Sequence, residues 1–211
     1  MKKIVCLICI VFSVNLMAET HKEYYTMTLQ NVTIDGTQDY SSDNCSNIIN
    51  REYTLGLNEN VFKDSLISIS FKLHLTHIDF TLACNINKNI KIDWNNALIV
   101  VNRSNHQVIH SGIVYKDRFE EQSPTTILRG MEYSDFIAPA DYVNLHDSWG
   151  WWFRKLFLKA DGDNQPIYVM LPIIIDGKST EYVFNFLANY HVGKIKVDII
   201  DSWRAEYVTL K

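Results

Sequence analysis

The chain has 211 residues, and its 24 acidic against 20 basic residues give it a net charge of −4 at pH 7. This length is sufficient for one domain with a sizeable buried core. The acidic balance, without a basic cluster interleaved with aromatic residues, argues against nucleic acid as a partner, because such a surface repels phosphate backbones.

Residues 1–18 have the order of a secretory signal peptide. Two lysines precede an apolar run of about 14 residues at positions 4–17, and the small Ala18 stands before a polar segment. A membrane-spanning helix needs roughly 20 residues, so we expect cleavage near Ala18 and no stable membrane anchor. An uncleaved anchor is the alternative, because Leu16 rather than a small residue lies three positions before the new terminus.

Residues 19–211 are then expected to form a single exported domain, periplasmic or extracellular. Its charge would be −6, because loss of the two lysines leaves 18 basic against 24 acidic residues. An oxidising compartment favours a disulfide between the two remaining cysteines, Cys45 and Cys84. Closing this loop of roughly 40 residues would stabilise the fold by about 4 kcal/mol. Two buried free thiols are the alternative.

Strand patterns dominate from Tyr24 onward and predict an all-β fold. The expected architecture is an antiparallel β-sandwich, immunoglobulin-like or of a related Greek key, with one short helical insertion. Apolar and polar residues alternate over residues 67–75, as in a strand with one buried face. Further strands are expected at residues 90–94, 97–101, 107–115, 167–175, 180–188 and 194–200.

After residue 75 the apolar positions change parity, through residues 78–84, with no Gly or Pro between. We interpret this change as a β-bulge near residues 76–77 in one long strand. The bulge would place His74, His77 and Asp79 on one polar face, a set that suits a divalent metal or a pH-sensitive contact. A solvated outer face of a sandwich would carry the same residues, and this is the alternative.

His106 and His110 form a weaker candidate pair. Four residues along a strand span about 13 Å, so these two imidazoles could share a metal only if the segment were not a strand. No Gly-x-Ser-x-Gly elbow is present, and the cysteines are expected to pair with each other. The sequence therefore predicts no catalytic residue and no cofactor.

Residues 148–159 are predicted to form a short amphipathic helix, with Ser148 as a possible N-cap and Gly162 as a stop. Apolar residues recur there at helical spacing, namely Trp149, Trp152, Phe153, Leu156 and Phe157. The aromatic members of this stripe could cap an open end of the sandwich, or they could face a protein, a glycan or a membrane surface. Trp151 and Leu158 lie off the stripe and favour the buried alternative.

A tight hairpin is expected at Asp176-Gly177, between the strands at residues 167–175 and 180–188, because both turn residues tolerate a positive φ. Pro172 lies within the first arm of this hairpin. Proline cannot donate to a strand ladder, so it predicts an edge position or a bulge there.

Several features occur in a recognisable order along the middle and late parts of the chain. They are residues 85–94 with Ile90 and Ile92, Ala97, His106-x-Val108-Ile109-His110-x-Gly112, Pro124, Gly130, Pro139, Leu171-Pro172-Ile173 and Tyr182-x-Phe184-x-Phe186. This order resembles uncharacterised exported proteins and lipoproteins of bacteria that are built as β-sandwiches. The resemblance covers about half the chain, implies an envelope protein, and assigns no catalytic or binding residue. Cys6 and Cys9 lie too early in the apolar run for lipidation.

These observations lead to two functional expectations. The first is a non-catalytic exported envelope protein, not an enzyme, that acts through contacts with a protein partner. The second is a periplasmic or surface binding protein for a metal, a glycan or another small ligand. An exported hydrolase has the least support.

Overall fold

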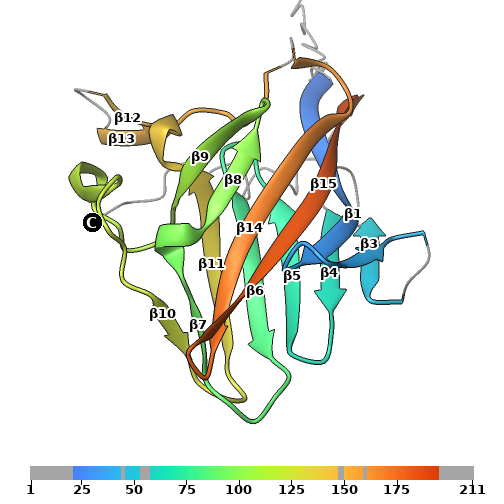
Figure 1. Ribbon diagram of the computed structural model, residues 1–211. Coiled ribbons are helices and arrows are strands. Elements are labelled where there is room, and N and C mark those ends of the chain that lie inside the picture. Colours follow the sequence, from blue (N-terminus) through green and yellow to red (C-terminus); the bar gives the residue numbers. More distant parts are fainter. Residues whose placement is uncertain (1–20, 44–45, 53–57, 147–149, 159–160, 195–211) are drawn as a thin grey trace, which may run out of the picture.

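The computed structural model describes residues 21–43, 46–52, 58–146, 150–158 and 161–194 (Figure 1). The strands of this part of the chain are β1 (His21–Ile34), β2 (Gln38–Ser41), β3 (Ile48–Glu52), β4 (Asn58–Lys63), β5 (Ile67–Leu73), β6 (Ile78–Cys84), β7 (Ile90–Ile92), β8 (Leu98–Val101), β9 (Ser104–Ile109), β10 (Thr125–Ile127), β11 (Glu132–Pro139), β12 (Val143–His146), β13 (Gly150–Phe153), β14 (Gln165–Ile175) and β15 (Lys178–Lys194). Three single-turn 3-10 helices connect them, η1 (Trp94–Asn96), η2 (Tyr115–Asp117) and η3 (Ala140–Tyr142). The predicted strand at residues 194–200 falls mostly outside the described residues.

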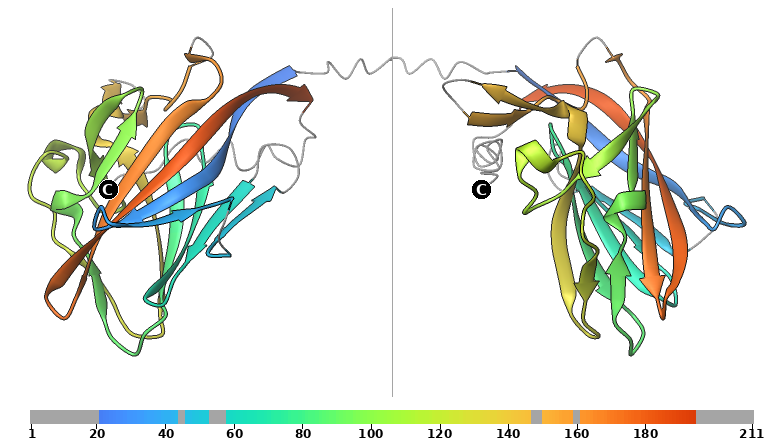
Figure 2. Two further views of the ribbon diagram at one scale, coloured as in Figure 1. Left: turned by 45° about the vertical axis from the view of Figure 1, so that its right-hand side comes forward. Right: turned by 60° about the vertical axis from the view of Figure 1, so that its left-hand side comes forward.

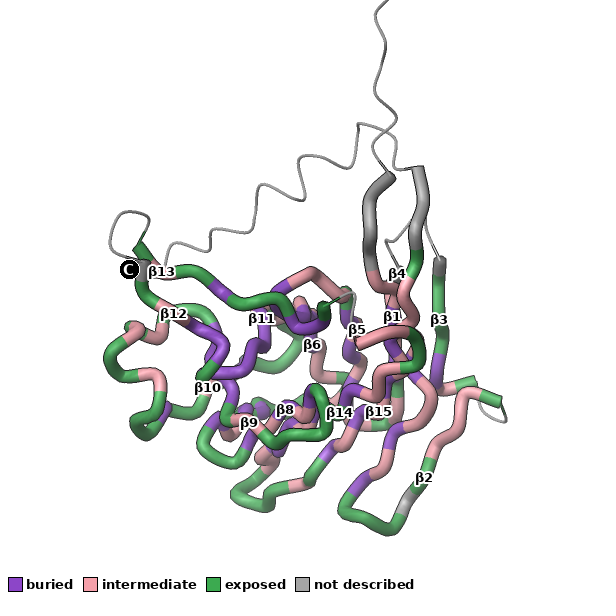
Figure 3. The backbone as a smooth tube through the Cα atoms, turned by 90° about the horizontal axis from the view of Figure 1, so that it is seen from above, coloured by how far each residue is buried: buried purple, intermediate pink, exposed green. Residues whose placement is uncertain are grey.

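All described strands except the β12–β13 hairpin belong to one antiparallel sheet, in the order β2-β1-β15-β14-β8-β9-β11-β6-β5-β4-β3. Two further strands, β7 and β10, extend it from β14. Seen from above, β4, β5 and β6 run along one side of the sheet and β8, β14 and β15 along the other (Figure 3). The all-β prediction is confirmed. An immunoglobulin-like sandwich is not confirmed, because the strands form one nearly closed, barrel-like sheet (Figure 2).

Aromatic side chains fill one part of the interior of this sheet. Alternate residues of β15, Tyr182, Phe184 and Phe186, are fully buried. Phe184 contacts Phe71 of β5 and Phe62 of β4, with ring centroids 4.8 and 5.9 Å apart. Every second side chain of β15 therefore points into the interior, where the aromatic rings contact strands β4 and β5 on the far side of the barrel-like sheet.

The hairpin predicted at Asp176-Gly177 is confirmed: both residues have positive φ, 51° and 80°, between β14 and β15. The edge position predicted for Pro172 is wrong, because β14 lies in the middle of the sheet. On the side away from β15, β14 pairs with β8 at residues 168–170 and with β7 at residues 173–175. Pro172 lies where β14 changes partner, so its missing N–H interrupts neither ladder.

A β-bulge in β1, between Leu29 and Asn31, marks the place where the sheet nearly closes. The Leu29 N–H donates to the side-chain oxygens of Asn50 on β3 and Asn60 on β4, at 3.1 and 3.0 Å. The Asn50 amide in turn donates to the Leu29 carbonyl at 3.0 Å. Two asparagine side chains thus make the contacts that a strand ladder makes elsewhere in the sheet.

Replacing Asn60 with alanine is expected to lower the free energy of unfolding by about 0.5 to 1.5 kcal/mol, because the Leu29 N–H would lose one of its two acceptors and keep only its bond to Asn50. Urea unfolding followed by circular dichroism measures this loss. Asn105→Ala, at an exposed position of β9, is the control and should change stability by less than about 0.5 kcal/mol. Equal losses in the two variants would show that the Asn60 contact is unimportant.

The bulge predicted near residues 76–77 is wrong, because residues 74–77 form the connection of a hairpin between β5 and β6. Leu73 pairs with Ile78, and the His74 N–H donates to the His77 carbonyl at 2.9 Å. Paired residues of antiparallel strands face the same side. Leu73 and Ile78 face the same side but are five positions apart, an odd number. The buried residues therefore have odd numbers before this hairpin and even numbers after it, which is the same change of parity that a bulge would cause. Such connections require neither Gly nor Pro.

The helix predicted over residues 148–159 is absent from the described residues of this segment. Gly150 has a φ of +77° and begins β13, which pairs with β12, and the remaining residues 154–158 are irregular. The apolar residues have helical spacing because two different segments bury them. Some lie on strand β13, and the others lie on the irregular residues 154–158. Phe153 packs in a second apolar cluster with Phe136, whereas Leu156 and Phe157 join the main core.

Among the described residues, the structure contains no helix with the length and apolar character needed to cross a membrane.

Candidate functional site

The outer face of β5, β6 and β11 carries polar side chains in cross-strand rows. Ser70 on β5 lies opposite Thr81 on β6, and Thr81 lies opposite Ser134 on β11. The hydroxyl groups of Thr81 and Ser134 are 2.9 Å apart and hydrogen-bonded. In the next row Lys72 lies opposite Asp79. Strands that are distant in sequence thus place hydroxyl and charged groups side by side.

A pocket with a volume of about 340 Å³ lies on this face. Its lining residues are Ser70, Lys72, Asp79, Phe80, Thr81, Ser111, Ser134, Asp135 and Phe136. Most of the lining side chains carry a hydroxyl group or a charge, so the pocket suits a small polar ligand.

His74, His77 and Asp79 meet at the edge of this pocket. The Nε2 atom of His74 is 2.9 Å from Asp79 Oδ2, and the Nε2 atom of His77 is 3.2 Å from Asp79 Oδ1. The two imidazole rings are stacked, with centroids 4.7 Å apart and an interplanar angle of 8°. The structure therefore brings together the three residues singled out from the sequence, by way of the β5–β6 hairpin. Metal binding by them stays a prediction.

The His77 ring is held in place from several sides. Its Nδ1 atom is 2.9 Å from the Thr76 hydroxyl, and its ring packs edge-on against Phe136 at 5.4 Å. The Leu156 N–H donates to the Leu75 carbonyl at 2.8 Å and fixes the connecting loop from outside. A hydrogen bond at Nδ1 that fixes the ring and leaves Nε2 as the ligand atom is the usual arrangement in metal-binding histidines.

Asp79 is ionised at neutral pH. Partial burial alone would raise the pKa of this carboxyl group, but the hydrogen bonds from His74 and His77 outweigh burial and hold the pKa well below its usual range. The carboxylate faces both imidazoles and has a half-exposed side chain. The site therefore offers two imidazole nitrogens and one charged oxygen, a donor set for a divalent transition metal ion.

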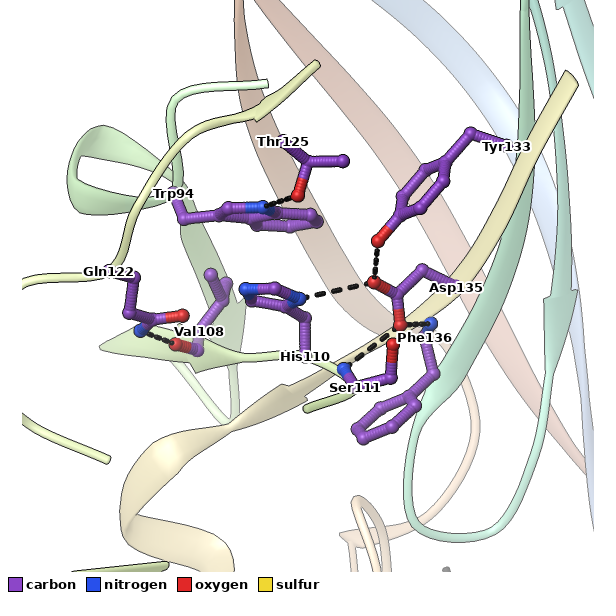
Figure 4. Close-up of polar contacts among 9 residues, drawn as sticks. All are labelled: Trp94, Val108, His110, Ser111, Gln122, Thr125, Tyr133, Asp135 and Phe136. Carbon is purple, nitrogen blue, oxygen red and sulfur yellow. Dashed lines mark hydrogen bonds and ion pairs between the residues drawn. The ribbon is translucent and has the colours of Figure 1, made fainter. Parts of the chain in front are cut away.

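A second polar cluster lies on the inner side of β11, where Asp135 is paired with Phe80 (Figure 4). The Asp135 carboxylate has no exposed surface and accepts hydrogen bonds from the Tyr133 hydroxyl and from the Ser111 and Phe136 N–H groups. His110 Nδ1 lies 3.1 Å from the same carboxylate. Burial would raise the pKa of Asp135, but the hydrogen bonds from His110, Tyr133 and Ser111 lower it.

The serine, histidine and aspartate of this second cluster do not have the geometry of a hydrolytic triad. His110 stacks on Trp94 at a centroid distance of 4.0 Å, and its Nε2 atom is buried without a hydrogen-bond partner. Ser111 bonds to Asp135 rather than to that nitrogen. In Figure 4 the Nε2 side of the ring faces Gln122 and points away from Asp135. Sequence analysis did not find this cluster, because no spacing motif connects residues 110 and 135.

The remaining candidate residues have separate surroundings. His106 pairs with Asp141 at 2.8 Å, whereas His110 pairs with Asp135, so these two histidines do not share a site. Cys84 carries a free thiol that donates to the Ile86 and Lys88 carbonyls. The structure does not show the disulfide predicted between Cys84 and Cys45. Cys45 lies outside the described residues. The Cys45–Cys84 pairing therefore stays a prediction.

The aromatic segment is buried in part. Phe153 and Phe157 are each 5% exposed, whereas Trp152 on β13 is 39% exposed. Trp149 lies outside the described residues, as do residues 1–18 with the predicted signal peptide. A partner surface at Trp152 stays a prediction.

Comparison of the chain with protein-family models, with curated proteins and with solved structures finds no match. The chemistry of the site is therefore inferred from its own residues and the distances between them.

Proposed function

We propose that this chain is an exported, non-catalytic protein of the bacterial cell envelope that binds a divalent transition metal ion through His74, His77 and Asp79. One observation carries the proposal: the ligand atoms of these three residues all lie within 4.8 Å of one another. A metal ion placed between them would replace the two histidine–aspartate hydrogen bonds with coordinate bonds. Imidazole nitrogen with a carboxylate oxygen favours zinc or copper over magnesium or calcium.

Binding rather than catalysis is supported by the surroundings of the cluster. The acidic residues that line the pocket are Asp79, a proposed ligand, and Asp135, whose carboxylate is enclosed and fully hydrogen-bonded. The buried Nε2 atom of His110 is out of reach of a pocket ligand. No free imidazole or carboxylate among the pocket-lining residues is therefore in a position to transfer protons.

Metal binding is expected to be measurable by isothermal titration of zinc into the purified protein after treatment with a chelator and its removal. The wild-type protein should bind one zinc ion per chain. His74→Ala and Asp79→Asn should each weaken binding at least about tenfold, since each removes one of three ligands. The affinity should fall at acidic pH, because the metal competes with protons for the imidazoles.

His106→Ala is the matched control. It removes a histidine that also pairs with an aspartate, Asp141, but that has no third potential ligand beside it among the residues that the structure describes. It should leave zinc affinity unchanged, and circular dichroism should show all variants folded. The proposal fails if elemental analysis finds no bound metal and neither zinc nor copper shifts the melting temperature. It also fails if His106→Ala weakens binding as much as His74→Ala.

A further inference from the structure

We infer that the pocket beside this cluster binds a small oxyanion, a carboxylate or a phosphate group, that completes the coordination of the metal ion. This inference rests on the proposed metal site. It adds a ligand class and names the residues that would recognise it, Lys72 and the hydroxyl row of Ser70, Thr81 and Ser134.

Asp79 belongs to both the metal cluster and the pocket. Its carboxylate faces His74 and His77 on one side, and the pocket extends from it along β6 and β11 past Thr81 and Ser134. Three protein ligands leave at least one position open on a four-coordinate metal ion. Of the three proposed ligands only Asp79 lines the pocket, so a further ligand in the pocket would approach the ion beside the Asp79 carboxylate.

The charge of the loaded site favours an anion. Lys72 lines the pocket opposite Asp79, and its ammonium group makes no ion pair with any residue that the structure describes. Lys72, Asp79 and Asp135 line the pocket and together give it a charge of −1 without a metal ion. A divalent ion bound to Asp79 changes this sum to +1, so anion binding should depend on the metal.

The hydroxyl row supplies the remaining recognition. Thr81 and Ser134 share one hydrogen bond, and each hydroxyl can make further ones. Ser70 continues the row on β5, so donors stand along the pocket from one strand to the next. A pocket of about 340 Å³ lies near the lower end of the range for small-molecule sites. A single carboxylate or phosphate group with a few attached atoms fits this volume.

The test uses cobalt in place of zinc, because the visible absorption of protein-bound cobalt changes when an anion enters its coordination sphere. Inorganic phosphate and acetate are titrated separately into the cobalt-loaded protein. At least one should change the spectrum saturably. Lys72→Ala should bind cobalt as the wild type does but raise the anion dissociation constant at least about tenfold. Ser70→Ala should raise it less, and Lys91→Ala, at an exposed lysine of β7, should leave it unchanged.

The outcomes separate the two proposals. If cobalt binds but neither anion changes its spectrum, or if Lys72→Ala matches the wild type, the oxyanion inference is wrong and the metal site stands. If cobalt does not bind at all, the proposed metal site is wrong and the inference fails with it. A response to phosphate alone or to acetate alone supports the inference and identifies the anionic group.

Discussion

Replacing Asp135 with alanine is expected to lower the free energy of unfolding by about 3 to 5 kcal/mol. The carboxylate has no exposed surface and is the shared partner of His110, Tyr133 and two backbone N–H groups. Its removal would leave the buried His110 side chain and the partly buried Tyr133 hydroxyl without this partner. A buried unsatisfied polar group costs far more than the hydrogen bond contributes when it is made.

Urea unfolding at neutral pH measures this loss, and Asp141→Ala is its matched control. Asp141 also pairs with a histidine, His106, at 2.8 Å, but its side chain is 49% exposed. Because Asp141 is half-exposed, water can replace its carboxylate as the partner of His106, so the control should lose no more than about 1 kcal/mol. A loss of similar size in both variants would mean that the enclosed position of Asp135 has no energetic importance.

The contribution of Asp135 should also depend on pH. Its folded pKa lies below the ordinary value of 3.8, so the folded protein binds this proton less readily than the unfolded chain. The stabilisation is therefore fully present above about pH 5 and is lost as the pH falls below the ordinary value. The difference in stability between the wild type and Asp135→Asn should narrow over that acidic range. A constant difference from pH 7 to pH 3 would contradict this account.

Replacing Phe184 with alanine is expected to cost about 3 to 5 kcal/mol of stability, the usual range for a buried phenylalanine. Phe184 is fully buried and contacts Phe62 and Phe71 across the sheet, with Tyr182 and Phe186 beside it on β15. The alanine variant would leave a cavity between strands of opposite sides, where the ladder of β15 prevents full collapse.

Phe119→Ala is the control for this second prediction. Phe119 is 51% exposed and contacts the Arg118 guanidinium, so its removal should cost less than about 1 kcal/mol. The midpoints of urea unfolding give both values. If Phe184→Ala unfolded at the same urea concentration as the control, the aromatic cluster would not be the energetic centre of the core.

The sequence predicted strands well where one face of a strand is buried. Buried and more exposed residues alternate in β5, β6 and β15 because a strand has a two-residue repeat. Asp176-Gly177 predicts its own turn because both residues tolerate a positive φ. It did not predict how the strands associate, because pairing across the sheet depends on residues far apart in the chain. Pro172 shows this limit: proline is incompatible with a continuous central ladder, but β14 changes partner at that residue.

The candidate site was predictable only in part. His74, His77 and Asp79 lie within six residues of one another, so local pattern sufficed to group them, although the local structure is a hairpin and not a bulge. Ser134 reaches the pocket only because β11 pairs with β6, and the Asp135 cluster depends on the same pairing. The prediction of a helix was wrong for a related reason. Two consecutive segments without helical structure can bury apolar residues at the same spacing as one amphipathic helix.

The contact between β1 and the strands β3 and β4 also affects how the protein moves. On the other side of β1, the ladder to β15 extends from His21 to Ile34 and is interrupted at the bulge, whereas here the side chains of Asn50 and Asn60 make the contact. Separating the strands along this line breaks few hydrogen bonds and leaves every ladder intact. Local opening of the interior should therefore begin at this line, well below the free energy of global unfolding. Amide hydrogen exchange at Leu29 would report such breathing while the β14–β15 hairpin stays protected.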